Sequence, residues 1–337
     1  MSETEESVAI ETKPKPALRC REQGNFAEWL ARSGGSLAVT TYTSGKLVLV
    51  SSRGDRLRFR TLRFPRPMGL ALSGRRLALA VQQRILLFQR TETDAVFLPH
   101  QEFVTGKLDT HDVAFGLRGL YFVNTRWNCL ARATTRCRFV RTWQPLFIAN
   151  MVRRDRCHLN GLGMQDGRPA LATAFCETNH AGGWREANRF SSGVLIDVAH
   201  NKVVARGLCM PHSPRRHRRR WWFCNSGHGT LETFDPHTGR CEEVCALSGF
   251  TRGLCFVGNH ALVGLSKIRP EHILDAPPVH GRHSQTRAGV ALVNLVTGSR
   301  TGLLEFAHGG NEVYEVLFLP QVKRPELIPF AEPRPSS

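Results

Sequence analysis

Hydrophobic and polar positions alternate along most of the chain in a sequence motif, here called a phrase, that occurs six times. The copy that begins at Cys157 has a polar head with His158 and Asn160, then alternating small and apolar residues, a polar turn and a second apolar run that ends at Ala174. Period-two alternation interrupted by a short polar turn is typical of a β-hairpin. Further copies begin at Phe64, Thr110, Met210 and Phe250, and the first half recurs from Asn311.

The heads of these phrases are regularly spaced. Successive heads are 40 to 52 residues apart except for the last step, which is 63 residues. Four-stranded propeller blades repeat about every 40 to 50 residues. The sequence therefore predicts an all-β fold, a closed β-propeller with six blades. The six equivalent head positions are Met68, His111, Asn160, His212, Arg252 and Glu315.

The two ends of the chain predict how the ring closes. The last phrase has one strand before the chain turns proline-rich at Pro320, whereas Ser36 to Phe64 has strands to spare. We expect residues 314–319 to pair with an N-terminal strand, because closure leaves no sheet edge open.

The remaining segments lie outside the blades. Residues 1–24 have the composition of a disordered tail, and 321–337 that of a proline-rich tail, which leaves 25–320 as one propeller domain. Near its start, Phe26, Trp29 and Leu30 share one face of a short N-terminal helix, which we expect to cap one end of the ring. Residues 268–287 have little apolar periodicity and are interpreted as a loop inserted in a blade.

Charge and hydropathy exclude some classes of protein. The formal net charge is +18, but the arginines are spread through the chain, and the one dense run, residues 215–220, is interpreted as a solvated hairpin turn. Nucleic acid is therefore not expected as a partner beyond non-specific charge attraction. No run is apolar enough to cross a bilayer, and the acidic, polar N-terminus differs from a signal peptide. A cytoplasmic protein is expected.

Several segments of the chain resemble a bacterial family of uncharacterised proteins. The matching segments include HDVAFG, CHLNGLG, ARGLCMPHSPR, GFTRGLCF and NEVYEV. The family is built on a domain of unknown function that is sometimes found beside tetratricopeptide repeats. The resemblance covers residues 26–320 and implies a propeller-like domain, and it implies no activity. The chain departs from the family pattern after PHSPR, where RRHRRR replaces an aromatic residue and an Asp-Gly turn.

The heads of the phrases supply the candidate chemistry. Inner strands of a propeller start near the central axis, so the heads are expected to converge on one mouth of the ring. Three histidines match the ligand set of a zinc, copper or iron site, so we expect His111, His158 and His212 to hold a divalent transition metal. The alternative is that each imidazole bonds backbone groups at the mouth. The candidate catalytic residues are His111, Asp112, His158, Asn160, His212 and Glu312.

Other polar residues are expected to bind a ligand at the same mouth. Arginine pairs with carboxylate or phosphate, and glycines beside a histidine allow close backbone approach. The candidate ligand-binding residues are Arg252, Glu315, Arg126, His228, Trp184 and Arg185. The insertion histidines His272, His280 and His283 are interpreted as loop residues unless the loop forms a lid.

Two functional classes remain open. In one, the axial pocket binds a small molecule or peptide, with or without metal-dependent catalysis. In the other, the propeller is a non-catalytic binding or scaffold module for a protein or polyanionic partner.

Overall fold

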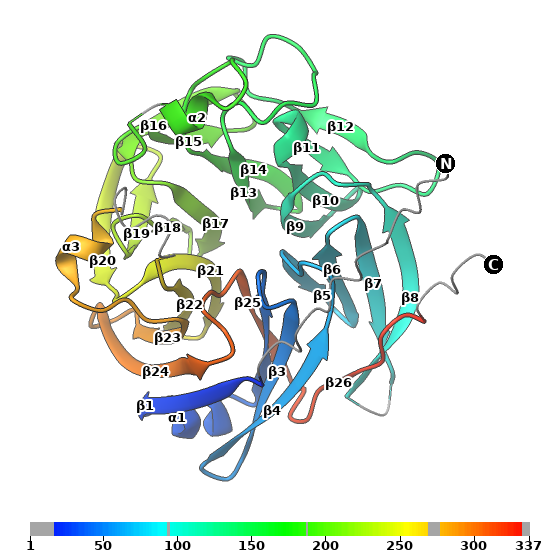
Figure 1. Cartoon of the computed structure of the whole chain (residues 1–337), viewed down its shortest axis with the longest axis vertical. Coiled ribbons are helices and arrows are strands. Elements are labelled where there is room, and N and C mark those ends of the chain that lie inside the picture. The colour runs from blue at the N-terminus through cyan, green and yellow to red at the C-terminus, as the bar shows by residue number, and fades with distance from the viewer. Residues whose placement is uncertain (1–16, 93–94, 187, 269–276, 332–337) are drawn as a thin grey trace, which may run out of the picture.

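Six β-sheets form a ring around a central axis in the computed structural model of the chain (Figure 1). The structure describes residues 17–92, 95–186, 188–268 and 277–331. The predicted all-β, six-bladed propeller is confirmed.

Each blade is given below from its innermost strand outward. Blade 1 contains β25 (Glu315–Pro320), β2 (Gly35–Thr41), β3 (Lys46–Arg53) and β4 (Arg56–Arg63). Blade 2 contains β5 (Leu70–Ser73), β6 (Arg76–Val81), β7 (Arg84–Arg90), β8 (Val96–Val104) and β26 (Glu326–Leu327). Blade 3 contains β9 (Thr110–Gly116), β10 (Gly119–Asn124), β11 (Cys129–Arg132) and β12 (Val140–Trp143).

The other half of the ring follows the same plan. Blade 4 contains β13 (Leu159–Gln165), β14 (Arg168–Ala174), β15 (Gly193–Asp197) and β16 (Lys202–Leu208). Blade 5 contains β17 (Pro211–His217), β18 (Arg220–Asn225), β19 (Thr230–Asp235) and β20 (Arg240–Ala246). Blade 6 contains β21 (Phe250–Val257), β22 (His260–Ser266), β23 (Gly289–Asn294), β24 (Ser299–His308) and β1 (Arg19–Gly24).

The ring closes through blade 1, as the sequence predicts. Strand β25 comes from the C-terminal part of the chain and pairs antiparallel with the N-terminal strand β2, from Gly35 opposite Pro320 to Thr40 opposite Glu315. The main-chain hydrogen bonds of this pairing satisfy edges that would otherwise be open.

Both expected tails contain a strand. Residues 19–24 form β1, which pairs with β24 on the outside of blade 6, and β26 within 321–337 pairs parallel with β8. Residues 1–16 and 332–337 of the expected tails lie outside the described residues. An outermost strand needs main-chain pairing and little apolar surface, so a charged segment can form one without an alternating pattern.

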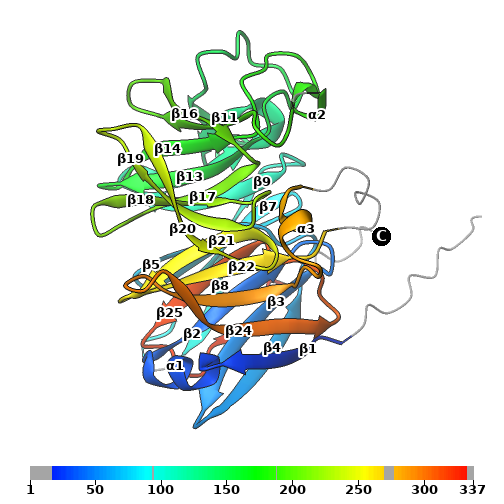
Figure 2. The ribbon, with the colours of Figure 1, turned by 90° about the vertical axis from the view of Figure 1, so that its left-hand side faces the viewer.

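The apolar core lies between neighbouring blades, where their side chains interdigitate. The seam between blades 6 and 1 buries Val48 and Leu304 together with Phe26 and Leu30 of helix α1 (Phe26–Arg32). The helix therefore packs against this seam, on the side of the ring opposite α2 and α3 (Figure 2).

Short helices mark one face of the ring. Helix α2 (Gly183–Glu186) and helix α3 (Val279–Arg282) both lie on the right-hand side of Figure 2. Strand β10 is followed by a single 3₁₀ turn, η1 (Thr125–Trp127). Within the described ranges, no helix has the length and apolar character needed to cross a membrane.

A register irregularity follows the head of four inner strands. In β17 the pairing shifts between His212 and Arg215, and in β21 between Thr251 and Leu254, with similar shifts in β9 and β13. An extra residue at such a bulge re-aims the side chains that follow it. The heads of these strands therefore face the mouth. Later residues face the axis, although the regular alternation of a strand would not place them there.

Candidate functional site

A continuous chain of ring contacts runs along the mouth on the face that carries α2 and α3. The rings of His111 and His158 are 4.9 Å apart between centroids, and Phe175 lies 4.5 Å from His158 and 5.3 Å from His212. His212 contacts Phe250 at 5.6 Å, and His111 contacts Tyr314 at 5.8 Å. We call this set the collar, and it consists of Tyr314, His111, His158, Phe175, His212 and Phe250.

The backbone of blade 3 fixes the orientation of His111. Its Nδ1 lies 2.8 Å from the carbonyl oxygen of Asp109 and 2.8 Å from Thr125 Oγ1. Asp109 has a positive φ of 52°, which turns its carbonyl back toward the ring. Because a carbonyl can only accept, Nδ1 carries the proton, which leaves Nε2 as an acceptor.

The other two histidines are also held through Nδ1, His212 as His111 is and His158 by a carboxylate. His212 Nδ1 lies 2.9 Å from both the carbonyl oxygen of Met210 and Ser226 Oγ, so blade 5 repeats the arrangement of blade 3. His158 Nδ1 lies 2.8 Å from a carboxylate oxygen of Asp155. Among the residues that the structure describes, no hydrogen-bond partner is found for Nε2 of any of the three imidazoles.

Burial keeps two of these imidazoles neutral. Removal from water lowers the pKa of His111 and of His212 well below the ordinary value, because burial disfavours the charged form. The neighbouring charges of His158 and then Arg252 lower the pKa of His111 further, and Arg252 does the same for His212. The mouth therefore presents uncharged acceptors at neutral pH.

The arrangement does not fit the expected three-histidine metal site. The Phe175 ring lies between His158 and His212, so the three imidazoles follow the collar and do not converge on one point. Across the described ranges, no group of three or more His, Cys, Asp or Glu side chains is placed to hold a metal ion. The sequence could not foresee Phe175, which follows the second strand of its blade.

Arg252 is the charged group of the mouth. Its guanidinium carbon lies 3.5 Å from the ring centroid of Tyr314, a cation–π contact. Burial raises the pKa of Tyr314, whose hydroxyl has no hydrogen-bond partner among the described residues. In the same part of the chain, no carboxylate lies within ion-pair distance of Arg252. A half-buried guanidinium thus faces the mouth without a counter-charge.

Two further aromatic side chains flank the collar. Tyr42 stacks on Tyr314 with 5.6 Å between centroids, and the guanidinium of Arg66 lies 4.5 Å over Tyr42. On the other side Trp184 of α2 packs 4.3 Å from His158, with Arg185 4.0 Å over the indole. Of the expected ligand-binding residues, Trp184 and Arg185 thus lie beside the collar.

The carboxylates of Asp112 and Glu315 lie near the axis of the ring and not at the mouth. Arg215 of β17 donates to both oxygens of Asp112, at 2.8 and 3.1 Å, and to Glu315 Oε2 at 2.9 Å. These residues come from the innermost strands of blades 5, 3 and 1, so their side chains can meet only near the axis. We call them the axial triad. Both carboxylates are almost fully buried, so neither is available to a ligand at the mouth.

Main-chain groups complete the axial triad. Leu162 N donates to Asp112, and Leu254 N donates to Glu315, at 3.0 and 3.1 Å. Burial raises the pKa of Glu315 to about 7, against the opposing attraction of Arg215.

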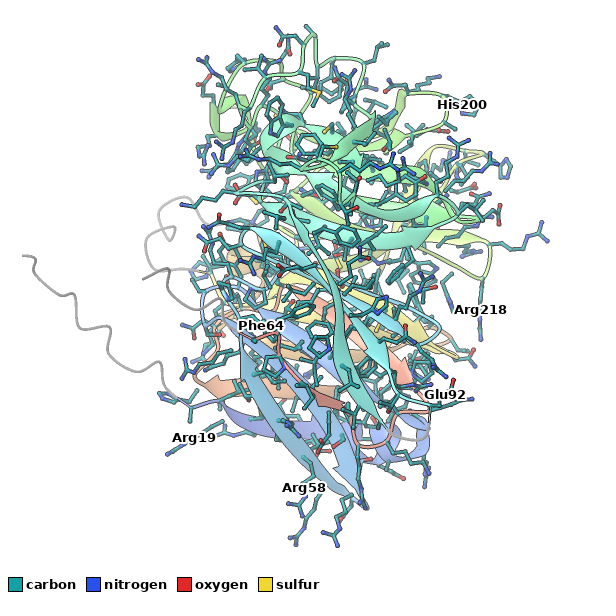
Figure 3. The ribbon with its side chains drawn as sticks, turned by 90° about the vertical axis from the view of Figure 1, so that its right-hand side faces the viewer. Arg19, Arg58, Phe64, Glu92, His200 and Arg218 are labelled. Atoms are coloured by element: carbon teal, nitrogen blue, oxygen red, sulfur yellow. The ribbon has the colours of Figure 1, made fainter. Side chains whose placement is uncertain are left out.

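The sequence interpretation of residues 215–220 as a solvated turn was wrong for Arg215, although Arg218 does project outward, as Arg58 does (Figure 3).

The remaining candidate catalytic residues lie apart from the collar contacts. Asn160 is buried and accepts a 2.5 Å hydrogen bond from Thr173, while its Nδ2 has no partner among the described residues. Glu312 accepts a hydrogen bond from the hydroxyl of Thr43. These contacts support the local backbone and assign neither side chain a ligand.

Arg126 and His228 occupy turns. The exposed Arg126 pairs with Asp109, with 2.5 Å between Arg126 Nε and the carboxylate.

His228 follows β18, and its Nδ1 is buried without a partner within the described ranges. The described end of the insertion docks beside it, where Val279 N donates to Gly227 O at 2.8 Å. His272 lies outside the described residues, and His280 is exposed.

Fold and site together define the class of this protein, a six-bladed β-propeller with a polar and aromatic cluster at one mouth. The chain belongs to the DUF4915 family, a domain of unknown function, whose model matches residues 24–328. A search of curated proteins finds no match.

Two solved structures are similar to this chain. One belongs to a nidogen/laminin complex, with a TM-score of 0.55, 10% identity, and coverage of 85% of this chain and 98% of that chain. The other is a protein of unknown function from Bacteroides caccae, with a TM-score of 0.55, 7% identity, and coverage of 85% and 98%. At these identities the similarity shows the fold alone.

Proposed function

We propose that the mouth of the propeller binds a small molecule or a peptide end through its carboxylate, with Arg252 as the pairing group. The observation that carries this proposal is the guanidinium of Arg252, which faces the mouth over Tyr314 without a carboxylate among the described residues. A guanidinium binds a carboxylate through two parallel hydrogen bonds. A ligand carboxylate would supply the missing counter-charge.

The collar histidines narrow the chemistry of the ligand. His111 and His212 each have Nδ1 bonded to a main-chain carbonyl oxygen, so their free Nε2 atoms are acceptors. An acceptor pairs with an O–H or N–H group of the ligand. A hydroxy acid, an amino acid derivative or the last residue of a peptide carries such a donor next to its carboxylate.

The aromatic side chains favour a binding function over a purely structural one. A buried polar group without a partner costs about 1 to 3 kcal/mol, and the mouth gathers several such groups beside Trp184 and Tyr42. The alternative, a polyanionic partner, would use exposed arginines such as Arg58 on the outside of the ring. The two proposals therefore place the essential charge in different regions.

Isothermal titration calorimetry with matched probes tests the proposal. Lactate, propionate and lactamide separate the contributions of the carboxylate and of the hydroxyl, and acetyl-Ala-Ala with a free or an amidated C-terminus tests the peptide. We expect binding of lactate and of the free acid peptide, weakened at least about tenfold in Arg252→Gln, since a charge-assisted hydrogen bond contributes about 1.5 to 3 kcal/mol.

Arg216→Gln is the matched control, because this exposed arginine belongs to β17 and bonds Gln165 outside the mouth. Its binding should equal that of the unmodified protein. Equal binding of lactate and lactamide, an unaffected Arg252→Gln, or no binding of any carboxylate probe would contradict the proposal.

A further inference from the structure

A second basic site lies on the rim of the ring, away from the mouth. A cavity of about 480 Å³ opens where the connection from β20 to β21, the described end of the insertion and the start of β24 meet. Figure 1 shows α3, β20 and β24 on the same side of the ring. We call it the rim cavity, and the residues that matter here are Ser248, Arg282, His283, Ser284, Arg287 and Arg300.

The charge of the rim cavity is positive. Three guanidiniums line it, and no carboxylate is among its lining residues in the described part of the chain. Arg282 contacts Glu243 at 3.2 Å and Arg287 contacts Glu305 at 2.7 Å, each through one nitrogen, while Arg300 pairs with no carboxylate in the described ranges. A guanidinium has five N–H donors, so most donors of this cluster remain available.

Two hydroxyl groups and an imidazole complete the lining. Ser248 and Ser284 contribute hydroxyl groups. His283 has a buried Nε2 that finds no hydrogen-bond partner among the described residues. A group that satisfies these donors must accept several hydrogen bonds at once and carry negative charge.

We propose that the rim cavity binds a phosphorylated small molecule. A phosphoryl group carries up to two negative charges and three acceptor oxygens, and arginine forks match it bidentately. Since Arg282 and Arg287 each keep a carboxylate neighbour, the number of donors decides: three acceptor oxygens match the free N–H groups of this cluster better than the two oxygens of a carboxylate. The volume is within the range of small-molecule sites, about 300 to 1,000 Å³.

A different cavity on the ring provides the control. It has a volume of about 660 Å³ and is lined by Arg90, Lys323 and Arg324, but also by Glu92, which pairs with Arg75 at 3.0 Å. This cavity shares the basic character of the rim cavity without its cluster of three guanidiniums. Arg324→Gln therefore removes the same charge from a comparable surface.

The experiment measures binding of inorganic pyrophosphate and inorganic phosphate to the full chain by calorimetry at constant ionic strength. We expect pyrophosphate to bind at one site, and Arg300→Gln and Arg282→Gln each to weaken it at least about tenfold, while Arg324→Gln and Arg252→Gln leave it unchanged. Both substituted arginines of the rim cavity are exposed, so the variants should fold, which thermal melting verifies.

Four outcomes would overturn this proposal. Equal weakening by Arg324→Gln would mean attraction to general surface charge, and weakening by Arg252→Gln would place the anion at the mouth. Failure of millimolar pyrophosphate to bind, or binding that neither rim variant weakens, would remove the site. The carboxylate proposal for the mouth has different probes and variants, so either proposal can fail alone.

Discussion

The axis of the ring contains two charged regions, and the difference between them is whether a charge has its partner. In the axial triad, Arg215 is shared between two carboxylates, and main-chain N–H groups satisfy the remaining oxygens. At the mouth, Arg252 meets a tyrosine face and neutral imidazoles. Although both arginines lie on inner strands, they have different physical roles.

The comparison separates charges that are paired within the fold from charges whose hydrogen-bond donors remain free. A buried charge with complete pairing links the elements that supply it, and removing one member leaves the others unpaired. A charge without a partner contributes little to folding and keeps its affinity for a ligand. Arg215 therefore belongs to the framework of the ring, whereas Arg252 keeps hydrogen-bond donors available at the mouth.

Deleting the chain from Asn311 onward should have the largest effect. Strand β25 supplies Glu315 to the axial triad and follows Tyr314 of the mouth, and it closes the ring on β2. The truncated protein should be insoluble or lack a cooperative transition, because two sheet edges are exposed. Removal of residues 1–16 is the control, and cooperative thermal melting of the Asn311 truncation would contradict the prediction.

Arg215→Met should destabilise the protein by about 3 to 5 kcal/mol, because it leaves Asp112 and Glu315 buried without their counter-charge. Urea unfolding at neutral pH measures the change. Arg216→Met, one residue along the same strand and exposed, should change stability by less than about 0.5 kcal/mol. Similar losses in both variants would mean that the axial triad does not stabilise the ring.

Glu315→Gln should change how stability depends on pH. The pKa of Glu315 is raised to about 7 from an ordinary value of 4.5, so between these values the folded protein holds a proton that the unfolded chain has lost. This group therefore stabilises the protein below about pH 4.5, and its contribution is lost as the pH rises through 7.

The collar histidines His111 and His212 change the pH dependence of stability in the opposite direction. Their lowered pKa means that the unfolded chain binds protons below about pH 6.5 that the folded protein does not, so stability falls with falling pH. Removing the Glu315 contribution should make the slope of unfolding free energy against pH more positive, by up to about 1.4 kcal/mol per pH unit. Urea unfolding between about pH 5 and about pH 7, where the two groups differ in protonation, measures the slope, and an unchanged slope contradicts the assignment.

Arg252→Gln should have the smallest effect on stability. The variant loses a cation–π contact of about 0.5 to 2 kcal/mol and also loses an unpaired charge, so the net change should be within about 1 kcal/mol. The pKa of His111 and of His212 should rise, because the charge that lowers both is gone. NMR titration of the imidazole protons measures the change, and a destabilisation as large as that of Arg215→Met would remove the distinction between the two regions.

Most of the fold could be predicted because it follows from a repeated pattern. Period-two alternation and the regular spacing of the heads predict the blades, and an unequal share of strands at the two ends predicts closure through β25 and β2. Strand β1 and helix α1 show the limit. The first pairs through its main chain, and the place of the second depends on a seam that forms only after the blades assemble.

The site residues at the strand heads could be predicted from the sequence, but those farther along the chain from the heads could not. His111, His158 and His212 do come together on one face, since equivalent positions of a repeat converge. Arg215 was missed because the bulge after His212 shifts the strand register, and simple alternation cannot tell which of several consecutive arginines turns inward. Phe175 lies outside the repeat heads, and its place between two imidazoles depends on three-dimensional packing.

The position of Tyr314 and Glu315 at the start of β25 also bears on how the protein matures. Both residues follow the strands of blades 3, 4 and 5 in the chain, and both depend on pairing with the first strand of blade 1. A ribosome-bound chain can therefore assemble blades 3, 4 and 5 before either the axial triad or the collar is complete. The last members of both clusters thus arrive in the same step as ring closure.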